Sequence, residues 1–250
     1  MSKPLSTYER KMKNQKFRKV YEQRYKSCAR FVRAVEGMGH SVIYTDDTGK
    51  HFRFYGGTWA WRNHNPGNVY PGNISKKHNR IGIVNKNSLA VFPDYESGHA
   101  ALIDVLKITY KNYSIDTMME KFAPRSENPT QKYIKFLYRV TGVTPGKKIK
   151  DFTSSEFQKL WKGIETMEAS KEGSVVEVYQ ISSVRVNHKG IIYSYCISDG
   201  WISIEQCIDL ARKGLVDLEI CISYLGNTYL RAPASSVFQE KLSELIEGKN

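Results

Sequence analysis

The sequence predicts an α+β protein in which a mostly helical domain with a small β hairpin is followed by a compact β-β-α-β-β-α module. Three observations support this fold class. Between residues 97 and 168, apolar side chains recur at spacings of three and four, the period of an amphipathic helix. After residue 173, apolar and polar residues alternate, as they do in half-buried strands. The chain has 250 residues with 40% hydrophobic and 12% aromatic content, which is enough to build hydrophobic cores.

The charge of the chain is uneven and changes sign near residue 173. The net charge is +13, but residues 173–250 carry 7 basic and 9 acidic side chains. We therefore expect a basic amphipathic helix over residues 1–40, a helical domain over residues 41–172 and a small α+β module over residues 173–250. The basic part of the chain favours a polyanionic partner, either nucleic acid or an anionic polysaccharide of the bacterial cell wall.

The first segment is predicted to be one long helix. Apolar residues recur at helical spacing from Phe17 to Val35, lysines and arginines occupy the other positions, and Gly37 follows the last of them. Binding of nucleic acid through residues 3–33 is one interpretation of this basic helix, and a solvated face on a packed helix is the other. Residues 41–58 then predict a hairpin, because two apolar runs flank the turn sequence Asp-Asp-Thr-Gly.

Helix ends can be recognised in the middle of the chain. Ser114 can cap a helix over residues 115–122, and Gly142 stands where a helix over residues 130–141 should end. Thr153-x-x-Glu156 is a capping box. The last third of the chain predicts four strands, over residues 175–186, 191–197, 216–222 and 228–230. It also predicts a helix that begins after Ser203 and a final helix over residues 236–247.

The loop Trp61-Arg-Asn-His-Asn-Pro-Gly-Asn68 contains more amide side chains than a connection needs. One interpretation is a rigid turn, because asparagine tolerates left-handed backbone geometry and closes side-chain turns. The other is a ligand site. Asn63, Asn65 and Asn68 would then bind N-acetyl and hydroxyl groups, Trp61 and Tyr70 would stack on a sugar face, and Arg62 would bind a carboxylate.

A series of short motifs follows this loop at fixed order. They are Ala90-Val-Phe92, Gly98-x-x-Ala101, Phe122-Ala-Pro124, Glu127-Asn128, Tyr133 and Thr141-Gly142. With the loop, the series resembles a phage and bacterial family of virion-associated, lysozyme-like proteins that carries an R-N-x-N-P-G-N motif. The resemblance covers about residues 57–170. It implies a lysozyme-like fold, action on peptidoglycan, and a place for Glu127, Asn128 and Tyr133 in the site.

The last third has its own resemblance. Val184-Arg185, Ser203-Ile-Glu-Gln206, Gly214 and Tyr229-Leu-Arg231 are similar to the pattern of a small uncharacterised bacterial α+β domain. The resemblance covers about residues 176–235 and implies no function. Attachment or binding of a protein partner through residues 173–250 is what we expect of this module.

Cleavage of a glycoside needs a carboxylic acid that keeps its proton near neutral pH. The candidates are Glu36, which closes an apolar helical face, Glu96, which precedes a helix start, and Glu127 in the turn after Ala-Pro. For each, a structural role is the competing interpretation. Glu168 follows the last predicted helix, and capping or exposure to solvent is the role we expect for it.

Other chemistry has less support. No H-E-x-x-H pattern or cysteine cluster accompanies the six histidines, so the sequence predicts no metal and no cofactor, although scattered zinc ligands are an alternative. The start of the chain lacks the apolar run of a signal peptide, and we expect no membrane span. The protein would be made in the cytoplasm and would reach the cell envelope with a virion or another carrier.

We therefore expect a protein that binds and cleaves peptidoglycan glycan, as a lysozyme, glucosaminidase or lytic transglycosylase does. One alternative is a structural or adaptor protein of a phage particle or delivery system, with the same surface used only for binding. The other is a nucleic-acid-binding protein that uses its basic N-terminal helix.

Overall fold

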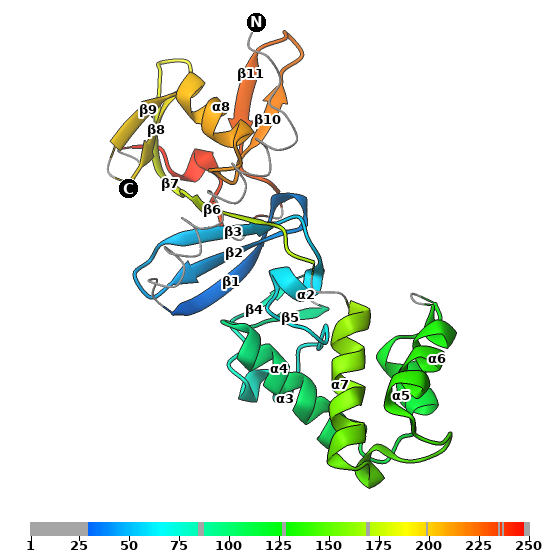
Figure 1. The fold of residues 1–250 in the computed structure, drawn as a ribbon. Coiled ribbons are helices and arrows are strands. Elements are labelled where there is room, and N and C mark those ends of the chain that lie inside the picture. Colours follow the sequence, from blue (N-terminus) through cyan, green and yellow to red (C-terminus); the bar gives the residue numbers. More distant parts are fainter. Residues whose placement is uncertain are drawn as a thin grey trace, which may run out of the picture.

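The computed structural model describes residues 30–84, 88–126, 129–168, 171–198, 200–234, 236 and 238–247. Within these residues the chain forms seven α-helices and eleven strands, and the strands make four small antiparallel sheets. The molecule is elongated, with the C-terminal module at one end, the largest sheet in the middle and the longer helices at the other end (Figure 1). The fold is thus a mixture of sheets and helices, and the prediction of a mostly helical, lysozyme-like domain followed by a β-rich module is wrong.

The central sheet has the strand order β1-β2-β3-β6. Its strands are β1 (Phe31–Gly37), β2 (Ser41–Asp46), β3 (His51–Tyr55) and β6 (Ser174–Val178). β2 and β3 form the predicted hairpin, so that prediction is confirmed. The Asp46 carboxylate closes its turn by accepting hydrogen bonds from the backbone N–H groups of Thr48 and Lys50, each at 2.9 Å.

β1 lies where the apolar spacing predicts the end of a long helix. Its buried side chains, Phe31 and Ala34, are three residues apart, and a regular strand would place them on opposite faces. A register shift between Phe31 and Arg33 brings both to the buried face. Because of the bulge, the buried residues of this strand have the spacing of a helix, and the helix prediction is wrong over residues 31–37. Residues 38–40 form a 3₁₀ turn, η1 (Met38–His40). Residues 1–29, which include nearly all of the proposed nucleic-acid-binding segment 3–33, lie outside the described residues.

The helical end of the molecule begins with short elements. These are α2 (Trp59–Arg62), α3 (Asn73–Lys77) and a two-stranded sheet of β4 (Gly82–Val84) and β5 (Leu89–Val91). The longer helices follow as α4 (Tyr95–Asp104), α5 (Ile115–Phe122), α6 (Thr130–Thr141) and α7 (Ser154–Glu168). α4 continues into a π-helical turn, η2 (Val105–Thr109), and a 3₁₀ turn, η3 (Ile149–Asp151), precedes α7.

The predicted ends of these helices are confirmed. Gly142 follows α6 with φ of 72°, a left-handed conformation that glycine adopts without strain. At the start of α7, the Thr153 N–H donates to the Glu156 carboxylate at 2.7 Å, and the Glu156 N–H donates to the Thr153 hydroxyl at 3.2 Å. The helices pack around a core of fully buried side chains: Leu102, Leu106, Ile115, Met118, Met119, Leu137 and Leu160.

The C-terminal module contains a three-stranded sheet, one helix and a separate hairpin. The elements are β7 (Ile181–Val186), β8 (Ile192–Ile197), β9 (Gly200–Ser203), α8 (Ile204–Arg212), β10 (Glu219–Ile222) and β11 (Thr228–Arg231). The predicted strand over 175–186 is divided, because β6 pairs with the edge of β3 and only β7 stays in the module. Pairing β6 with β3 satisfies the backbone groups of that edge.

The final helix predicted over residues 236–247 is wrong. Among the described residues of this segment, the helical structure is one 3₁₀ turn, η4 (Leu242–Glu244), although Phe238 and Leu242 are buried at helical spacing. The buried Gln239 side chain explains the difference. Its Oε1 accepts from the Ile181 N–H at 2.7 Å and its Nε2 donates to the Ile181 carbonyl at 3.1 Å, so this segment is fixed to β7 by a side chain and stays irregular.

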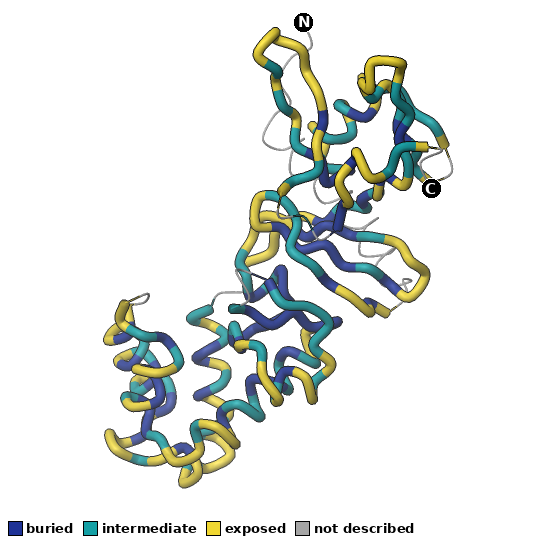
Figure 2. Tube along the Cα trace, turned by 180° about the vertical axis from the view of Figure 1, so that it is seen from behind, coloured by how far each residue is buried: buried dark blue, intermediate teal, exposed yellow. Residues whose placement is uncertain are grey.

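A buried ion pair joins the module to the central sheet. Arg53 of β3 donates from Nη2 to the carboxylate of Asp217, and the two side chains are 9% and 1% exposed. The same carboxylate accepts hydrogen bonds at 3.2 Å from the Met38 N–H and from the Ser236 hydroxyl. Buried residues occur in the central sheet, in the module and in the helices (Figure 2).

Candidate functional site

The asparagine loop after α2 is held in place by one of its own side chains. Asn65 Nδ2 donates to the carbonyls of Val69 and Ala90, each at 2.9 Å, and Asn65 Oδ1 accepts from the Val69 N–H at 2.8 Å. Asn63 and Asn65 are both 0% exposed. The structure therefore gives these two residues a place in the interior instead of the expected contact with a ligand.

Replacing Asn65 by alanine should destabilise the protein. The change leaves a buried N–H and two buried carbonyls without the partner that Asn65 provides, and each such loss costs about 1–3 kcal/mol when no water replaces it. We expect a loss of at least about 2 kcal/mol in the free energy of unfolding, measured by urea denaturation. Asn73→Ala, in the exposed first turn of α3, is the control and should change stability little. Equal stability of the Asn65→Ala variant and the parent would contradict the structural role.

Asn68, at the end of the loop, has a different environment. Its φ of 45° lies in the left-handed region, which asparagine tolerates better than most residues. Its Nδ2 donates to Oε2 of Glu168 at 2.5 Å. Glu168 is the last residue of α7. It is 100 positions further along the chain than Asn68, but the two side chains meet because α7 ends beside the loop. The loop thus meets a carboxyl group at a helix end.

The environment of Glu168 favours its protonated form. Burial raises the pKa of the Glu168 carboxyl, and the hydrogen bond from Asn68 opposes the shift without cancelling it. The C-terminal position on α7 acts in the same direction as burial, because the helix dipole disfavours negative charge there. The pKa of Tyr133 on α6 is raised by burial and by the charge of Glu168, which places Tyr133 in the same electrostatic environment.

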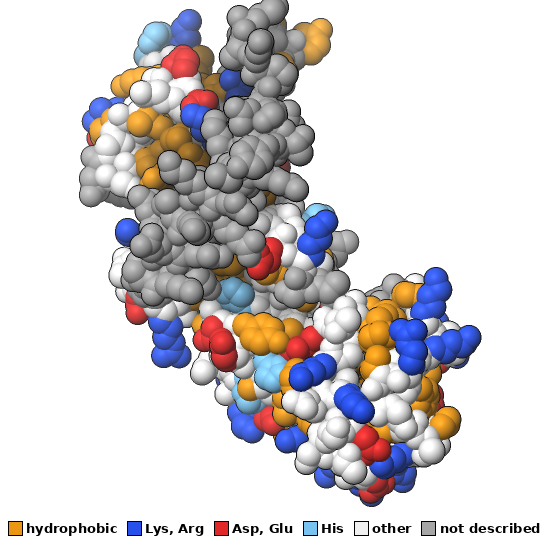
Figure 3. Space-filling model, viewed as in Figure 1, with side chains coloured by type: hydrophobic (Ala, Val, Ile, Leu, Met, Phe, Trp, Pro, Cys, Tyr) orange, Lys and Arg blue, Asp and Glu red, His pale blue; other side chains and the backbone are white. Residues whose placement is uncertain are grey.

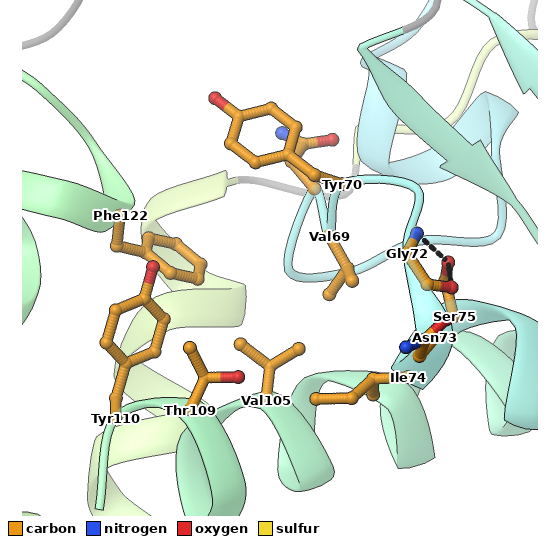
Figure 4. Close-up of a pocket in the computed structure, with 11 residues that line it drawn as sticks. Val69, Tyr70, Gly72, Asn73, Ile74, Ser75, Val105, Thr109, Tyr110 and Phe122 are labelled. Atoms are coloured by element: carbon orange, nitrogen blue, oxygen red, sulfur yellow. Dashed lines mark hydrogen bonds between the residues drawn. The ribbon is translucent and has the colours of Figure 1, made fainter.

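A pocket of about 360 Å³ is lined in part by Asn68, the hydrogen-bond partner of Glu168 (Figure 4). Asn68, Tyr70 and the start of α3 line one side, and Val105, Thr109, Tyr110 and Phe122 line the other. In Figure 4, Tyr70 faces Tyr110 and Phe122 across the cavity, with Val105 and Thr109 along its floor. An apolar basin with tyrosine hydroxyls at its edge suits a ligand that has both apolar faces and hydroxyl groups.

The other residues predicted from the loop have separate positions. Tyr70 is 53% exposed and lines the pocket. Trp61 packs against the core of the central sheet, with its ring 5.3 Å from that of Phe54. Arg62 is buried, donates to the carbonyls of Gly56 and Gly57 at 2.5 and 2.9 Å, and stacks over Trp59. Trp61 and Arg62 therefore contribute to the structure, and only Tyr70 and Asn68 of the predicted loop residues reach the pocket.

Of the predicted acidic residues, Glu36 and Glu96 do not line the pocket. Glu36 is paired with Val42 in the central sheet, and its carboxylate lies 3.9 Å from Nδ1 of His40, so it does not end a helix as predicted. Glu96 is exposed in the first turn of α4, where its charge suits the helix dipole. Glu127 and Asn128 lie outside the described residues. Tyr133 is half-buried and packs against the helical core.

The sequence alone predicts only a structural role for Glu168, namely capping or exposure to solvent. One signal for its place does exist: Trp161, Glu165 and Glu168 are separated by four and three residues, which puts them on one face of α7. The sequence does not show which loop that face meets.

Among the described residues, no cluster of three or more histidine, cysteine, aspartate or glutamate side chains is arranged to hold a metal ion. In the same part of the chain, no helix is both long enough and apolar enough to cross a bilayer. Comparison of the sequence with protein-family models finds no match, and comparison with curated proteins finds no match either.

Proposed function

We propose that the protein binds a glycan of the peptidoglycan type in the pocket beside the asparagine loop and cleaves one of its glycosidic bonds. Glu168 is the proton donor in this proposal. The contact that carries it is the hydrogen bond between Asn68 and Glu168 at 2.5 Å, next to the pocket. General acid catalysis of glycoside cleavage requires a carboxyl group with a raised pKa, and burial raises the pKa of Glu168.

The reaction can proceed with one carboxyl group. Glu168 gives its proton to the bridging oxygen as the bond between that oxygen and the anomeric carbon breaks, and both electrons of the bond stay on the oxygen. A hydroxyl group, from water or from the sugar itself, then attacks the anomeric carbon. The Glu168 carboxylate accepts the proton of that hydroxyl group, which restores the acid. Asn68 holds the carboxyl group in one orientation through both steps.

The surface around the helices is compatible with an anionic polymer. Basic side chains gather over α5, α6 and α7 in Figure 3. The exposed basic residues of this part include Lys121, Lys132, Lys135, Arg139, Lys159 and Lys162. Exposed lysine and arginine attract polyanions over a range of about 10 Å at moderate salt, so the carboxylates and phosphates of a cell wall would be concentrated near the pocket.

Digestion of purified cell walls tests the proposal. We expect the protein to sediment with insoluble peptidoglycan and to release soluble muropeptides, which chromatography with mass spectrometry would identify. Products with a new reducing end indicate capture by water, and anhydro products indicate capture by the sugar hydroxyl. Binding without products would discard cleavage and leave the binding-only alternative. Neither binding nor products would discard the proposed function.

A further inference from the structure

Exposed basic side chains line both α6 and α7. Lys132, Lys135 and Arg139 follow one another along α6 at spacings of three and four residues, which places them on one line of about 10 Å. Lys159 and Lys162 are three residues apart on α7 and are also exposed. Basic side chains gather over this part of the molecule in Figure 3. We call these five residues the basic face.

Helix geometry brings the two sets to the same side of the helix pair. The helices touch at Gly163 of α7, where an added Cβ atom would lie 2.7 Å from Leu137 Cδ2 and 3.7 Å from Phe136 Cε1. Measured from Phe136 on α6 and from Gly163 on α7, the basic residues are turned by about 40–100° in the same rotational sense. The helices run in opposite directions (Figure 1), so this common sense of rotation points both sets to one side.

Acidic side chains do not neutralise the basic face. Helix α6 contains no acidic residue, and none of the five basic residues forms an ion pair with an acidic residue in the part of the chain that the structure describes. The acidic residues of α7 bond to other parts of the molecule: Glu156 to Lys147, Glu165 to His99 and Glu168 to Asn68. The positive charge of this face is therefore available to an anionic partner.

The side chains of the basic face suit phosphate groups more than nucleic-acid bases. Four of the five are lysines, which bind phosphate as point charges without a fixed geometry. Single-stranded nucleic acid is held by bases stacked on aromatic rings as well as by charge. The rings beside this face, Phe136 and Trp161, are half-buried, and Arg139 and Lys162 lie over them at 5.4 Å. The face thus fits a polymer that is recognised through its phosphates alone.

We propose that the basic face binds a polyol-phosphate polymer, a chain of phosphodiesters without bases, of the kind that is attached to peptidoglycan in bacterial walls. The proposal rests on the proposed function for the choice of a wall polymer, but its ligand and its site are separate from the glycan and the pocket. Cations spread over about 10 Å act together on successive phosphates, because this distance is close to the screening length at moderate salt. Binding at this face would retain the protein on the wall between cleavage events.

Binding of soluble poly(glycerol phosphate) to the full chain, measured by calorimetry, tests the proposal. A variant of α6 with Lys132→Gln, Lys135→Gln and Arg139→Gln should bind about tenfold to 100-fold more weakly at about 0.1 M salt. The slope of log affinity against log salt concentration should become less steep by about two, since three phosphate contacts are lost. A second variant, Lys159→Gln with Lys162→Gln, tests the same face from α7 and should also bind more weakly.

Matched controls separate the basic face from net charge. Lys50→Gln, Lys171→Gln and Lys189→Gln together remove the same charge from exposed positions outside the helices and should leave the affinity within about twofold of the parent. Arg139→Lys keeps the charge and changes only the shape of the group, so it should bind as tightly as the parent. Equal affinity of the α6 variant and the triple control would overturn the proposal.

Sedimentation with cell walls identifies the polymer. Hydrofluoric acid removes phosphodiester polymers from walls and leaves peptidoglycan, so the parent should sediment less with treated walls than with untreated ones. Equal sedimentation with both would overturn the proposal, and so would tighter binding to duplex DNA than to poly(glycerol phosphate) at equal phosphate concentration. A protein that binds the polymer through the basic face but releases no muropeptides would keep this proposal and discard cleavage. Muropeptide release without polymer binding would do the reverse.

Discussion

Replacing Glu168 by glutamine should lower the rate of wall cleavage by a factor of about 100 or more, while the variant still sediments with cell walls. Glutamine keeps the size of the side chain and can accept the hydrogen bond from Asn68 Nδ2, but its amide is not acidic enough to protonate the leaving oxygen. Loss of a general acid typically costs a factor of about 10²–10⁴ in rate. Release of soluble muropeptides over time from purified walls is the measurement.

The pH dependence of the parent gives the same prediction an independent test. Because burial raises the pKa of Glu168, the acid stays protonated above the pH at which an exposed glutamate ionises. The rate should therefore fall as the pH rises through this raised pKa. Glu96→Gln is the matched control, since Glu96 is exposed on α4, and it should leave both the rate and the pH profile unchanged. If the Glu168→Gln variant still cleaves walls and the Glu96→Gln variant does not, then Glu168 is not the proton donor.

Stability separates a chemical effect of the Glu168 change from an unfolding effect. The folded protein binds the Glu168 proton more tightly than the unfolded chain does, so the stabilisation from this group is complete below the ordinary glutamate pKa. It is lost as the pH rises through the raised pKa of the folded state. Glutamine stays neutral at every pH. The variant should thus be at least as stable as the parent at neutral pH, which thermal denaturation at several pH values would measure.

The local signals in the sequence predict local structure well. The Asp-Asp-Thr-Gly turn predicts the β2–β3 hairpin, and the Thr153–Glu156 pair and Gly142 mark the ends of helices where the structure has them. Each of these features depends on hydrogen bonds or backbone angles within a few residues. Such local interactions can be predicted from neighbouring residues in the sequence.

Contacts between distant segments account for the errors. The bulge in β1 places Phe31 and Ala34 on one face, and only pairing with β2 reveals it. Gln239 bonds to the backbone of Ile181 across 58 positions and keeps a helix-like sequence irregular. The spacing of apolar residues indicates which residues are buried, but it does not indicate which strand or helix they pack against.

The candidate site was predicted only in part for the same reason. The motif identifies a loop in which three asparagines stand close together, but side-chain direction decides what each one does. Asn65 bonds to Val69 and Ala90 and shapes the loop, whereas Asn68 reaches Glu168 across 100 positions. The Glu168 carboxyl group belongs to α7, and the sequence of that helix does not indicate that it ends beside the loop.

Replacing Asp217 by alanine should lower the free energy of unfolding by about 3–5 kcal/mol, because it leaves Arg53 as a buried charge without its partner. Burial already lowers the pKa of Arg53, and the charge of Asp217 opposes that shift. The Met38 N–H and the Ser236 hydroxyl lose an acceptor as well. Urea denaturation measures the loss. Glu219→Ala, which removes an exposed ion pair with Arg231, is the control and should cost no more than about 1 kcal/mol.

A double variant distinguishes an unpaired charge from a general packing defect at this junction. Arg53→Met combined with Asp217→Leu removes both charges and keeps apolar volume, so it should be more stable than Asp217→Ala even though it changes two buried residues. If the double variant is instead less stable than the single one, then packing around β3 and the module, and not the ion pair, dominates the energy of the junction. Because Arg53 belongs to the central sheet and Asp217 to the module, the expected result also means that folding of the module is coupled to folding of the sheet that precedes the asparagine loop.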